Sequence, residues 1–181
     1  MCAIQSQIRL ETSRLVLRTA RPDDAVVIAD RINDYDIARM TTRVPFPYSL
    51  DDARGFLGRG SPSERTFLIE HWEFGPIGVV GFSEASTSWS ETGCALSPEI
   101  GYWLGRTFWG RGFATEAVTA ALDWAHTRWG RRAVASGHFA DNPASGRVLE
   151  KAGFLYTGEV QPRFSLSRCE VASTRMMVWL A

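Results

Sequence analysis

The chain has 181 residues, 45% of them hydrophobic and 12% aromatic, and its 20 basic and 20 acidic residues leave a formal net charge of zero. This composition argues against disorder, and the charge balance excludes the basic footprint of a general nucleic-acid-binding protein. The length suits one hydrophobic core, so we expect residues 1–181 to form a single domain.

Cysteine usage and hydropathy exclude further classes of protein. The three cysteines are far apart in the chain, and none lies in a C-x-x-C pair. They favour neither a disulfide framework nor a zinc site, and the three histidines form no metal-ligand cluster, so we expect no metal. No apolar run approaches the ~20 residues that span a bilayer, and the N-terminus lacks the long apolar core of a signal peptide. We therefore expect a cytoplasmic protein with neither a membrane nor a nucleic-acid partner.

The N-terminal part of the chain predicts one strand and two helices. Alternation predicts the strand over Ile8–Thr19, with Leu15 and Leu17 on one face. Pro22 and the acids after it predict the start of a helix. Ser49-Leu50-Asp51-Asp52 resembles a capping box that opens a second helix through about Leu57. Two prolines between these helices disfavour a continuous helix there.

The rest of the chain alternates between strands and helices. A hairpin is expected from strands 66–70 and 77–83, followed by a loop with some strand over 86–98. Strands are expected at 99–104, 133–139, 154–160 and 173–180, with a loop around 162–170. One helix is expected over 114–129 from its apolar period, and another after Asn142 as N-cap and Pro143 at the first position. This order predicts an α/β fold.

A glycine-rich segment, Trp109-Gly110-Arg111-Gly112-Phe113-Ala114, lies between a predicted strand and a predicted helix. Gly110 and Gly112 allow a tight turn and the close approach of a ligand. Free backbone N–H groups from Arg111 to Thr115 would then suit a pyrophosphate. The alternative is a loop that merely turns the chain, because short glycine patterns are weak signals. The segment matches neither a Walker A loop nor G-x-G-x-x-G.

The segment resembles the coenzyme A-binding motif of the GNAT superfamily of N-acetyltransferases, usually Gln/Arg-x-x-Gly-x-Gly/Ala. Gly112 and Ala114 match the last two defined positions, whereas Trp109 departs from the first. The variant W-G-x-G-x-A-T-E-A after E-I-G-Y-W-L is typical of the branch of ribosomal-protein-alanine acetyltransferases, the RimJ/RimL type. E-T-S-R-L-V-L-R, V-P-F-P-Y-S-L-D-D-A, N-P-A-S and V-L-E-K-A-G-F also resemble that branch. The similarity extends from about Leu10 to Leu180.

The resemblance implies a GNAT fold, with a mixed, mostly antiparallel central sheet, a splayed strand pair and about four flanking helices. The strands at 102–104 and 133–139 would separate, and the pantetheine arm of acetyl-CoA would lie in the gap. Its implied contacts are the backbone of Leu104 and the side chain of Asn142, whose other role is to cap its own helix. The pyrophosphate would be held by backbone amides of Arg111, Gly112, Phe113, Ala114 and Thr115.

The resemblance also implies the catalytic roles. Many members place a tyrosine four residues after the position of Ser145 as the acid for the departing thiolate, but this chain has Leu149 there. In the similar branch, a serine at the position of Ser145 is proposed to contact the sulfur; the alternative is a helix serine bonded to backbone. Glu99 is the implied base, directly or through a water; the alternative is a glutamate paired with an arginine. Glu159, in the strand after Gly153-Phe154, is the second and weaker candidate for the base. Glu116 is interpreted as structural, since a carboxylate suits a helix N-terminus.

We therefore expect an enzyme that moves acetyl from acetyl-CoA to a primary amine, by direct attack in a ternary complex. The acceptor is a protein N-terminal amine or a small-molecule amine, and the segment from Tyr35 to Tyr48 is where the branch shapes its choice. A homodimer is possible. The alternative is a coenzyme A-binding regulatory or interaction module without catalysis. The missing tyrosine and the departure at Trp109 keep that alternative open.

Overall fold

The structure is a computed structural model that describes residues 8–58, 65–83 and 97–181. The strands are β1 (Arg9–Glu11), β2 (Leu15–Thr19), β3 (Arg65–His71), β4 (Gly75–Ser83), β5 (Glu99–Leu104), β6 (Ala133–Phe139), β7 (Leu155–Ser165) and β8 (Glu170–Leu180). The α-helices are α1 (Ala25–Ile32), α2 (Tyr35–Ala38), α3 (Leu50–Gly58), α4 (Phe113–Thr127) and α5 (Pro143–Lys151). Short 3₁₀ helices are η1 (Pro22–Asp24), before α1, and η3 (Arg106–Phe108), after β5.

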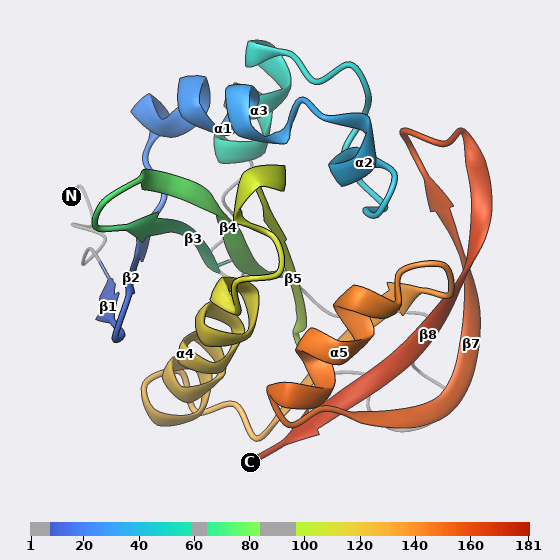
Figure 1. Cartoon of the computed structure of the whole chain (residues 1–181). Helices are drawn as coiled ribbons and strands as arrows, with labels where there is room; N and C mark the ends of the chain where they lie inside the picture. Colours follow the sequence, from blue (N-terminus) through green and yellow to red (C-terminus); the bar gives the residue numbers. More distant parts are fainter. Residues whose placement is uncertain (1–7, 59–64, 84–96) are drawn as a thin grey trace, which may run out of the picture.

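The described strands form one mixed sheet of eight strands in the order β1-β2-β3-β4-β5-β6-β8-β7. Neighbouring strands run antiparallel, except that β5 and β6 are parallel. Figure 1 shows β1–β5 in one half of the molecule and β6–β8 in the other. The α/β architecture with a mixed, mostly antiparallel sheet confirms the predicted fold class.

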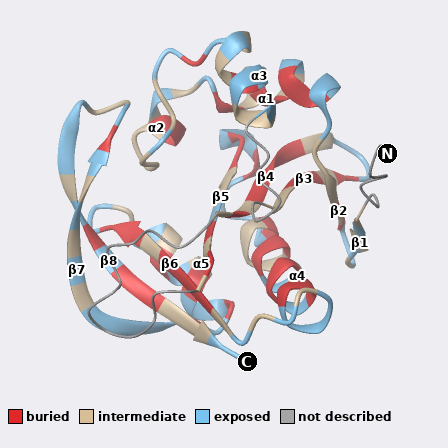
Figure 2. Ribbon diagram, turned by 180° about the vertical axis from the view of Figure 1, so that it is seen from behind, coloured by how far each residue is buried: buried red, intermediate tan, exposed pale blue. Residues whose placement is uncertain are grey.

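Helices cover both faces of the sheet, because the strands are apolar on both sides. In β3, Phe67 and Ile69 pack into a cluster with α4 and α5, while Leu68 packs into a second cluster with α1 and α3. The first cluster includes the apolar stripe of α4, where Val118, Ala121, Leu122 and Ala125 recur with the predicted helical period and are all buried. Figure 2 shows this buried side of α4 against the sheet.

Two predicted boundaries are wrong. The segment Ile8–Thr19 holds two strands, because Thr12 accepts a hydrogen bond from the backbone N–H of Leu15 at 2.9 Å and turns the chain. The loop expected around residues 162–170 is a long hairpin whose turn covers only residues 166–169. Pro162 is tolerated in β7 because β7 is an edge strand of the sheet.

Several local predictions are confirmed. The capping box at the start of α3 is present, since the Ser49 hydroxyl accepts from the Asp52 N–H at 3.1 Å and Asp52 accepts from the Ser49 N–H at 2.8 Å. The interruption of helix between Asn33 and Tyr48 is present as well, apart from the short α2. Most of the loop expected at 86–98 lies outside the described residues, as do residues 59–64. Within the described ranges, no helix has the length and apolarity to cross a membrane.

Candidate active site

The central feature of the candidate site is the separation of β5 from β6. The two parallel strands are in register at Glu99 and Ala135, where the Ala135 N–H donates to the Pro98 carbonyl at 2.9 Å. Beyond that point, the Ser136 hydroxyl bridges to the Ile100 carbonyl at 3.0 Å in place of a backbone ladder. Meanwhile β5 stays paired with β4, and β6 with β8, along their lengths. The sheet is thus joined at one end of this pair and open at the other.

A cavity of about 630 Å³ lies at this opening. Its walls come from both halves of the sheet and from the segment after α2. From the strands and α5 they include Glu99, Tyr102, Trp103, Ser136, His138, Ser145 and Arg163. Apolar lining side chains come from α1, α3 and the segment before α3: Ile28, Ile32, Val44, Pro45, Tyr48 and Phe56. The cavity therefore offers polar groups from the strands and α5, and apolar side chains from α1, α3 and the segment between them.

The glycine-rich segment forms the entrance to α4. Gly110 and Gly112 both adopt positive φ, 75° and 79°, in the left-handed region that favours glycine. Gly112 is the N-cap of α4 and makes no side-chain cap hydrogen bond. The backbone N–H groups in the first turn of a helix have no intrahelical partner, so in α4 they are not capped by the N-cap side chain either. Such a helix start attracts anions. This is the local geometry that the sequence predicted for residues Arg111 to Thr115.

Trp109, the departure from the family motif, has a structural role. Its indole N–H donates to the Leu104 carbonyl at 2.8 Å, so it ties the glycine-rich segment to the end of β5. The Leu104 carbonyl keeps a second lone pair for another donor. A glutamine or arginine is therefore not needed here to hold the segment against the strand.

The N-terminal hairpin clamps the start of α4 through Glu116. One carboxylate oxygen accepts from the Thr12 hydroxyl at 2.6 Å, the Ser13 hydroxyl at 3.0 Å and the Arg14 N–H at 2.9 Å. The other accepts from Arg14 Nε at 2.8 Å, and Arg14 Nη1 donates to the Arg111 carbonyl at 3.0 Å. Burial acts to raise the pKa of Glu116, but these hydrogen bonds outweigh it and leave the pKa below its usual value. The contacts agree with the structural role that the sequence predicted for Glu116.

Asn142 and Ser145 stand at the start of α5, and Ser145 lines the cavity. The Asn142 side-chain oxygen accepts from the Ser145 N–H at 3.1 Å, which is the predicted N-cap. The Asn142 side-chain amide can still donate to a ligand. The Ser145 hydroxyl lies 2.8 Å from the hydroxyl of Tyr102, which comes from β5 on the opposite wall.

Tyr102 is a candidate that the sequence interpretation missed. The available signal is its place in β5, between Ile100 and Leu104, which are both buried. A tyrosine on such a face usually needs a hydrogen-bond partner. Burial raises the pKa of Tyr102, and the hydrogen bond with Ser145 opposes that effect only in part.

Glu99 is paired with Arg163 of β7. Arg163 Nη1 lies 2.5 Å from Glu99 Oε1 and Nη2 lies 3.0 Å from Oε2, a two-pronged ion pair on the cavity wall. This is the arginine partner that the sequence left open as an alternative for Glu99. The carboxylate has about four lone-pair sites, so the pair leaves room for a water at Glu99.

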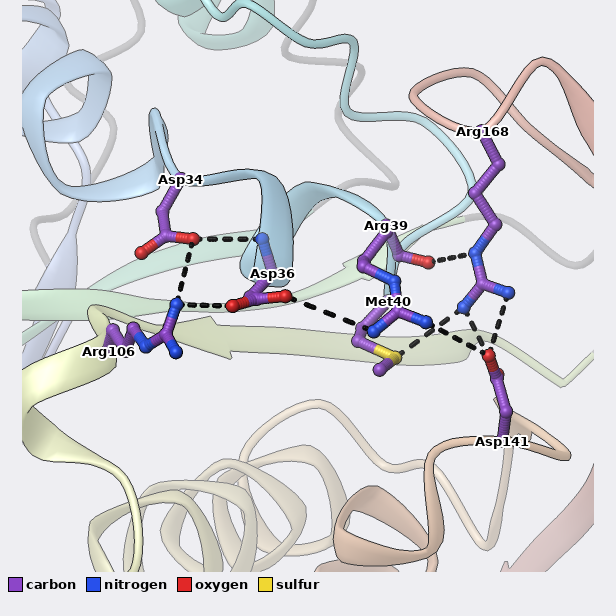
Figure 3. Close-up of polar contacts among 7 residues, drawn as sticks. All are labelled: Asp34, Asp36, Arg39, Met40, Arg106, Asp141 and Arg168. Carbon is purple, nitrogen blue, oxygen red and sulfur yellow. Dashed lines mark hydrogen bonds and ion pairs between the residues drawn. The ribbon is translucent and has the colours of Figure 1, made fainter.

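Ion pairs fix α2 at both ends, as Figure 3 shows. At one end, Arg106 of η3 contacts Asp34 and Asp36. At the other end, Arg168 in the β7–β8 turn donates to the Arg39 carbonyl and binds Asp141 at 2.9 and 3.1 Å. Hydrogen bonds from Arg168 are the main cause that lowers the pKa of Asp141. The segment that begins at α2 and lines the cavity from Met40 to Pro45 is thereby anchored to both halves of the sheet.

Comparison with known proteins identifies the family. Residues 14–155 match the family model described as the acetyltransferase (GNAT) domain. The chain belongs to the GNAT acetyltransferase family. It is thus an acyl-CoA-dependent acetyltransferase by class. It is 28% identical over 156 residues to the N-acetyltransferase p20 of Bacillus licheniformis, covering 82% of this chain and 83% of that relative.

Solved structures share the fold. The ribosomal-protein alanine acetyltransferase of Vibrio fischeri has a TM-score of 0.78 at 18% identity, covering 96% of each chain. The spermidine N-acetyltransferase of Vibrio cholerae, in complex with CoA and spermine, has a TM-score of 0.75 at 23% identity, covering 93% of this chain and 96% of the other. At these identities the likeness establishes the common fold, including the sheet that carries the cavity.

Proposed function

We propose that this protein transfers acetyl from acetyl-CoA to a primary amine of a protein N-terminus or a small molecule, by direct attack in a ternary complex. The observation that carries the proposal is the opening between β5 and β6, with Ser145 in its wall, together with the uncapped start of α4, the helix that follows β5. The acyl donor is supported by the related spermidine acetyltransferase structure, which contains CoA.

The residues that would hold the donor are those predicted from the sequence. The backbone N–H groups of Arg111, Gly112, Phe113, Ala114 and Thr115 suit its pyrophosphate, because the loop and first turn of α4 carry free donors. The second lone pair of the Leu104 carbonyl and the side-chain amide of Asn142 suit the amide groups of the pantetheine arm.

In the proposed reaction, Glu99 accepts a proton from the amine through a water, because an ammonium group cannot attack a thioester. Arg163 holds the carboxylate in place. A backbone N–H of β5 polarises the thioester carbonyl. The nitrogen of the neutral amine forms a bond to the carbonyl carbon, and the carbon–sulfur bond breaks. The nitrogen loses its second proton to solvent, and Ser145 stabilises the sulfur as it leaves.

The fold neighbours and the motifs that resemble the RimJ/RimL type support a place in that branch, and with it a protein N-terminal amine among the acceptors. Polyamines are the second acceptor class, favoured by the likeness to the spermidine acetyltransferase. Glu99 and Arg163 both line the described cavity. Their opposite charges neutralise each other in the ion pair.

Calorimetry with acetyl-CoA, followed by thiol release across a panel of amines, tests the proposal. The panel contains peptides that begin with alanine or serine, and small polyamines. We expect binding of acetyl-CoA and amine-dependent thiol release. Binding without turnover on any amine would favour the alternative, a coenzyme A-binding module without catalysis.

A further inference from the structure

Two hydroxyl groups from opposite walls of the cavity meet at hydrogen-bonding distance. Tyr102 belongs to β5 and Ser145 to the first turn of α5, and their hydroxyl oxygens are 2.8 Å apart. The Tyr102 oxygen also lies 3.1 Å from the Ser145 carbonyl oxygen. Both residues line the cavity. This contact therefore joins the two walls at the place where Ser145 faces the opening.

The proton count allows two arrangements of this pair. Tyr102 has one hydroxyl proton, and a carbonyl oxygen can only accept. If Tyr102 donates to the Ser145 carbonyl, the Ser145 proton points at Tyr102 and is unavailable to a ligand. If Tyr102 donates to the Ser145 hydroxyl oxygen, the Ser145 proton is free to point into the cavity. The second arrangement is the one that a negative charge in the cavity would favour.

Two further observations suit Tyr102 to this donor role. Leu149, four residues after Ser145, is fully buried and has no polar group, so that position of α5 supplies no proton. Burial also keeps Tyr102 protonated, since it raises the pKa of the phenol. Among the described residues, Tyr102 is the tyrosine whose hydroxyl contacts Ser145.

We propose that Tyr102 is a positioning residue, which donates to the Ser145 hydroxyl oxygen and so directs the Ser145 proton at the departing thiolate. The inference rests on the proposed acetyl transfer. In that step the carbon–sulfur bond breaks and its electron pair stays on sulfur. Ser145 donates a hydrogen bond to the sulfur, the proton of the amine leaves through Glu99, and the thiolate takes its proton from solvent. No bond to the protein forms.

The test uses Tyr102→Phe, Ser145→Ala and the double variant, with Tyr156→Phe as the matched control. The Tyr156 hydroxyl contacts His138 at 3.1 Å and is half-exposed on β7. The thiol of bound CoA is titrated by the ultraviolet absorbance of its thiolate, and kcat and KM are measured with the best amine.

We expect Tyr102→Phe to raise the pKa of the bound thiol by about one unit and to lower kcat about tenfold, because it removes a hydrogen bond that supports a charge. The KM for acetyl-CoA should change less than about twofold, because the substitution leaves intact the contacts that bind acetyl-CoA equally in the ground state and the transition state. In the Ser145→Ala background the Tyr102 substitution should add nothing, because Tyr102 acts through Ser145. Tyr156→Phe should match the wild type.

Three results would overturn the inference alone while the wild type still acetylates amines. They are an unchanged thiol pKa in Tyr102→Phe, additive effects of the two substitutions, or a rise in KM with kcat preserved. A wild-type protein that binds no CoA, or acetylates no amine, would instead overturn the proposed function, and this inference with it.

Discussion

Arg163 of β7 donates hydrogen bonds to both carboxylate oxygens of Glu99 of β5, at 2.5 and 3.0 Å. The pair bridges the two halves of the sheet beside the point where β5 and β6 separate. It gives Glu99 a fixed orientation in the cavity wall, which suits the proposed role of a base that acts through a water. Glu99 can be both the ion-pair partner of Arg163 and a base, because a paired carboxylate still has free lone pairs.

Glu99→Gln tests the role of Glu99 as base. Glutamine keeps the size of the side chain but cannot take up a proton, so we expect kcat to fall by about 100-fold or more. The comparison variant is Glu159→Gln on β7, the second candidate base, whose carboxylate accepts from Gln161 and does not line the described cavity. Wild-type turnover in Glu99→Gln would remove Glu99 from the mechanism.

Glu116→Gln tests the clamp on the start of α4. The substitution replaces one accepting oxygen by an amide donor, so hydrogen bonds from Thr12, Ser13 and Arg14 are lost or weakened. We expect the Kd for acetyl-CoA to rise about tenfold, because bonds to a charged group contribute about 1.5–3 kcal/mol each and only part of that loss reaches the loop. Calorimetry measures the Kd, with the exposed Asp123→Asn on the same helix as control. Equal affinities would mean that the contacts of Glu116 do not shape the proposed phosphate-binding segment.

Arg168→Met tests the anchoring of α2. Methionine keeps much of the apolar stem but breaks the contacts with Arg39 and Asp141. The cavity-lining segment from Met40 to Pro45, which we propose shapes the choice of acceptor, should then loosen, so we expect the KM for the amine to rise about threefold to tenfold, equivalent to about 1 kcal/mol. The KM for acetyl-CoA should stay the same. A change in both constants, or in the acetyl-CoA constant alone, would argue against a role on the acceptor side.

Asp24→Asn tests a pH-dependent contribution to stability. Asp24 binds Arg18 at 2.7 and 2.8 Å and accepts from the Arg21 N–H at 2.7 Å. Burial acts to raise the pKa of Asp24, but these bonds outweigh it and lower the pKa. A lowered carboxylate pKa stabilises the fold fully above the unfolded value of about 3.9, and this contribution is lost as pH falls through the lower folded value.

We therefore expect Asp24→Asn to lower the free energy of unfolding at neutral pH by about 2 kcal/mol, since Arg18 still binds Glu70 at 3.0 Å. Denaturant titrations from neutral to acid pH should show the wild type and the variant converging below the folded pKa of Asp24. The control is Asp51→Asn, whose side chain is 87% exposed and pairs with Arg54 on the surface. A difference that stays constant with pH would exclude the linkage.

The regular elements were predictable because their signals are local. The strands Glu99–Leu104 and Ala133–Phe139 match the predicted ranges, and Asn142 caps α5 as its sequence indicated. These features depend on the period of apolar residues, on glycines and on capping residues, all of which lie within a few positions of the element that they specify. The hairpin of β7 and β8 extends further than predicted because pairing along a sheet edge overrides the local signal of Pro162.

The candidate site was only partly predictable, because its contacts join distant segments. Glu99 meets Arg163 across 64 residues, and Glu116 meets Thr12 across 104. Arg163 lies in a segment that was predicted to be a loop. The ion pair between Arg163 and Glu99 could therefore not be predicted from the sequence. Tyr102 lay inside a strand that was predicted correctly, but the hydroxyl it contacts is 43 residues away.

The central claim is direct transfer between two substrates that are bound together. Initial rates measured at several fixed amine concentrations, while acetyl-CoA is varied, test it most directly. Direct attack in a ternary complex predicts double-reciprocal lines that intersect. Parallel lines, together with an acetyl group trapped on the protein, would contradict the account, because they require a covalent acetyl-enzyme.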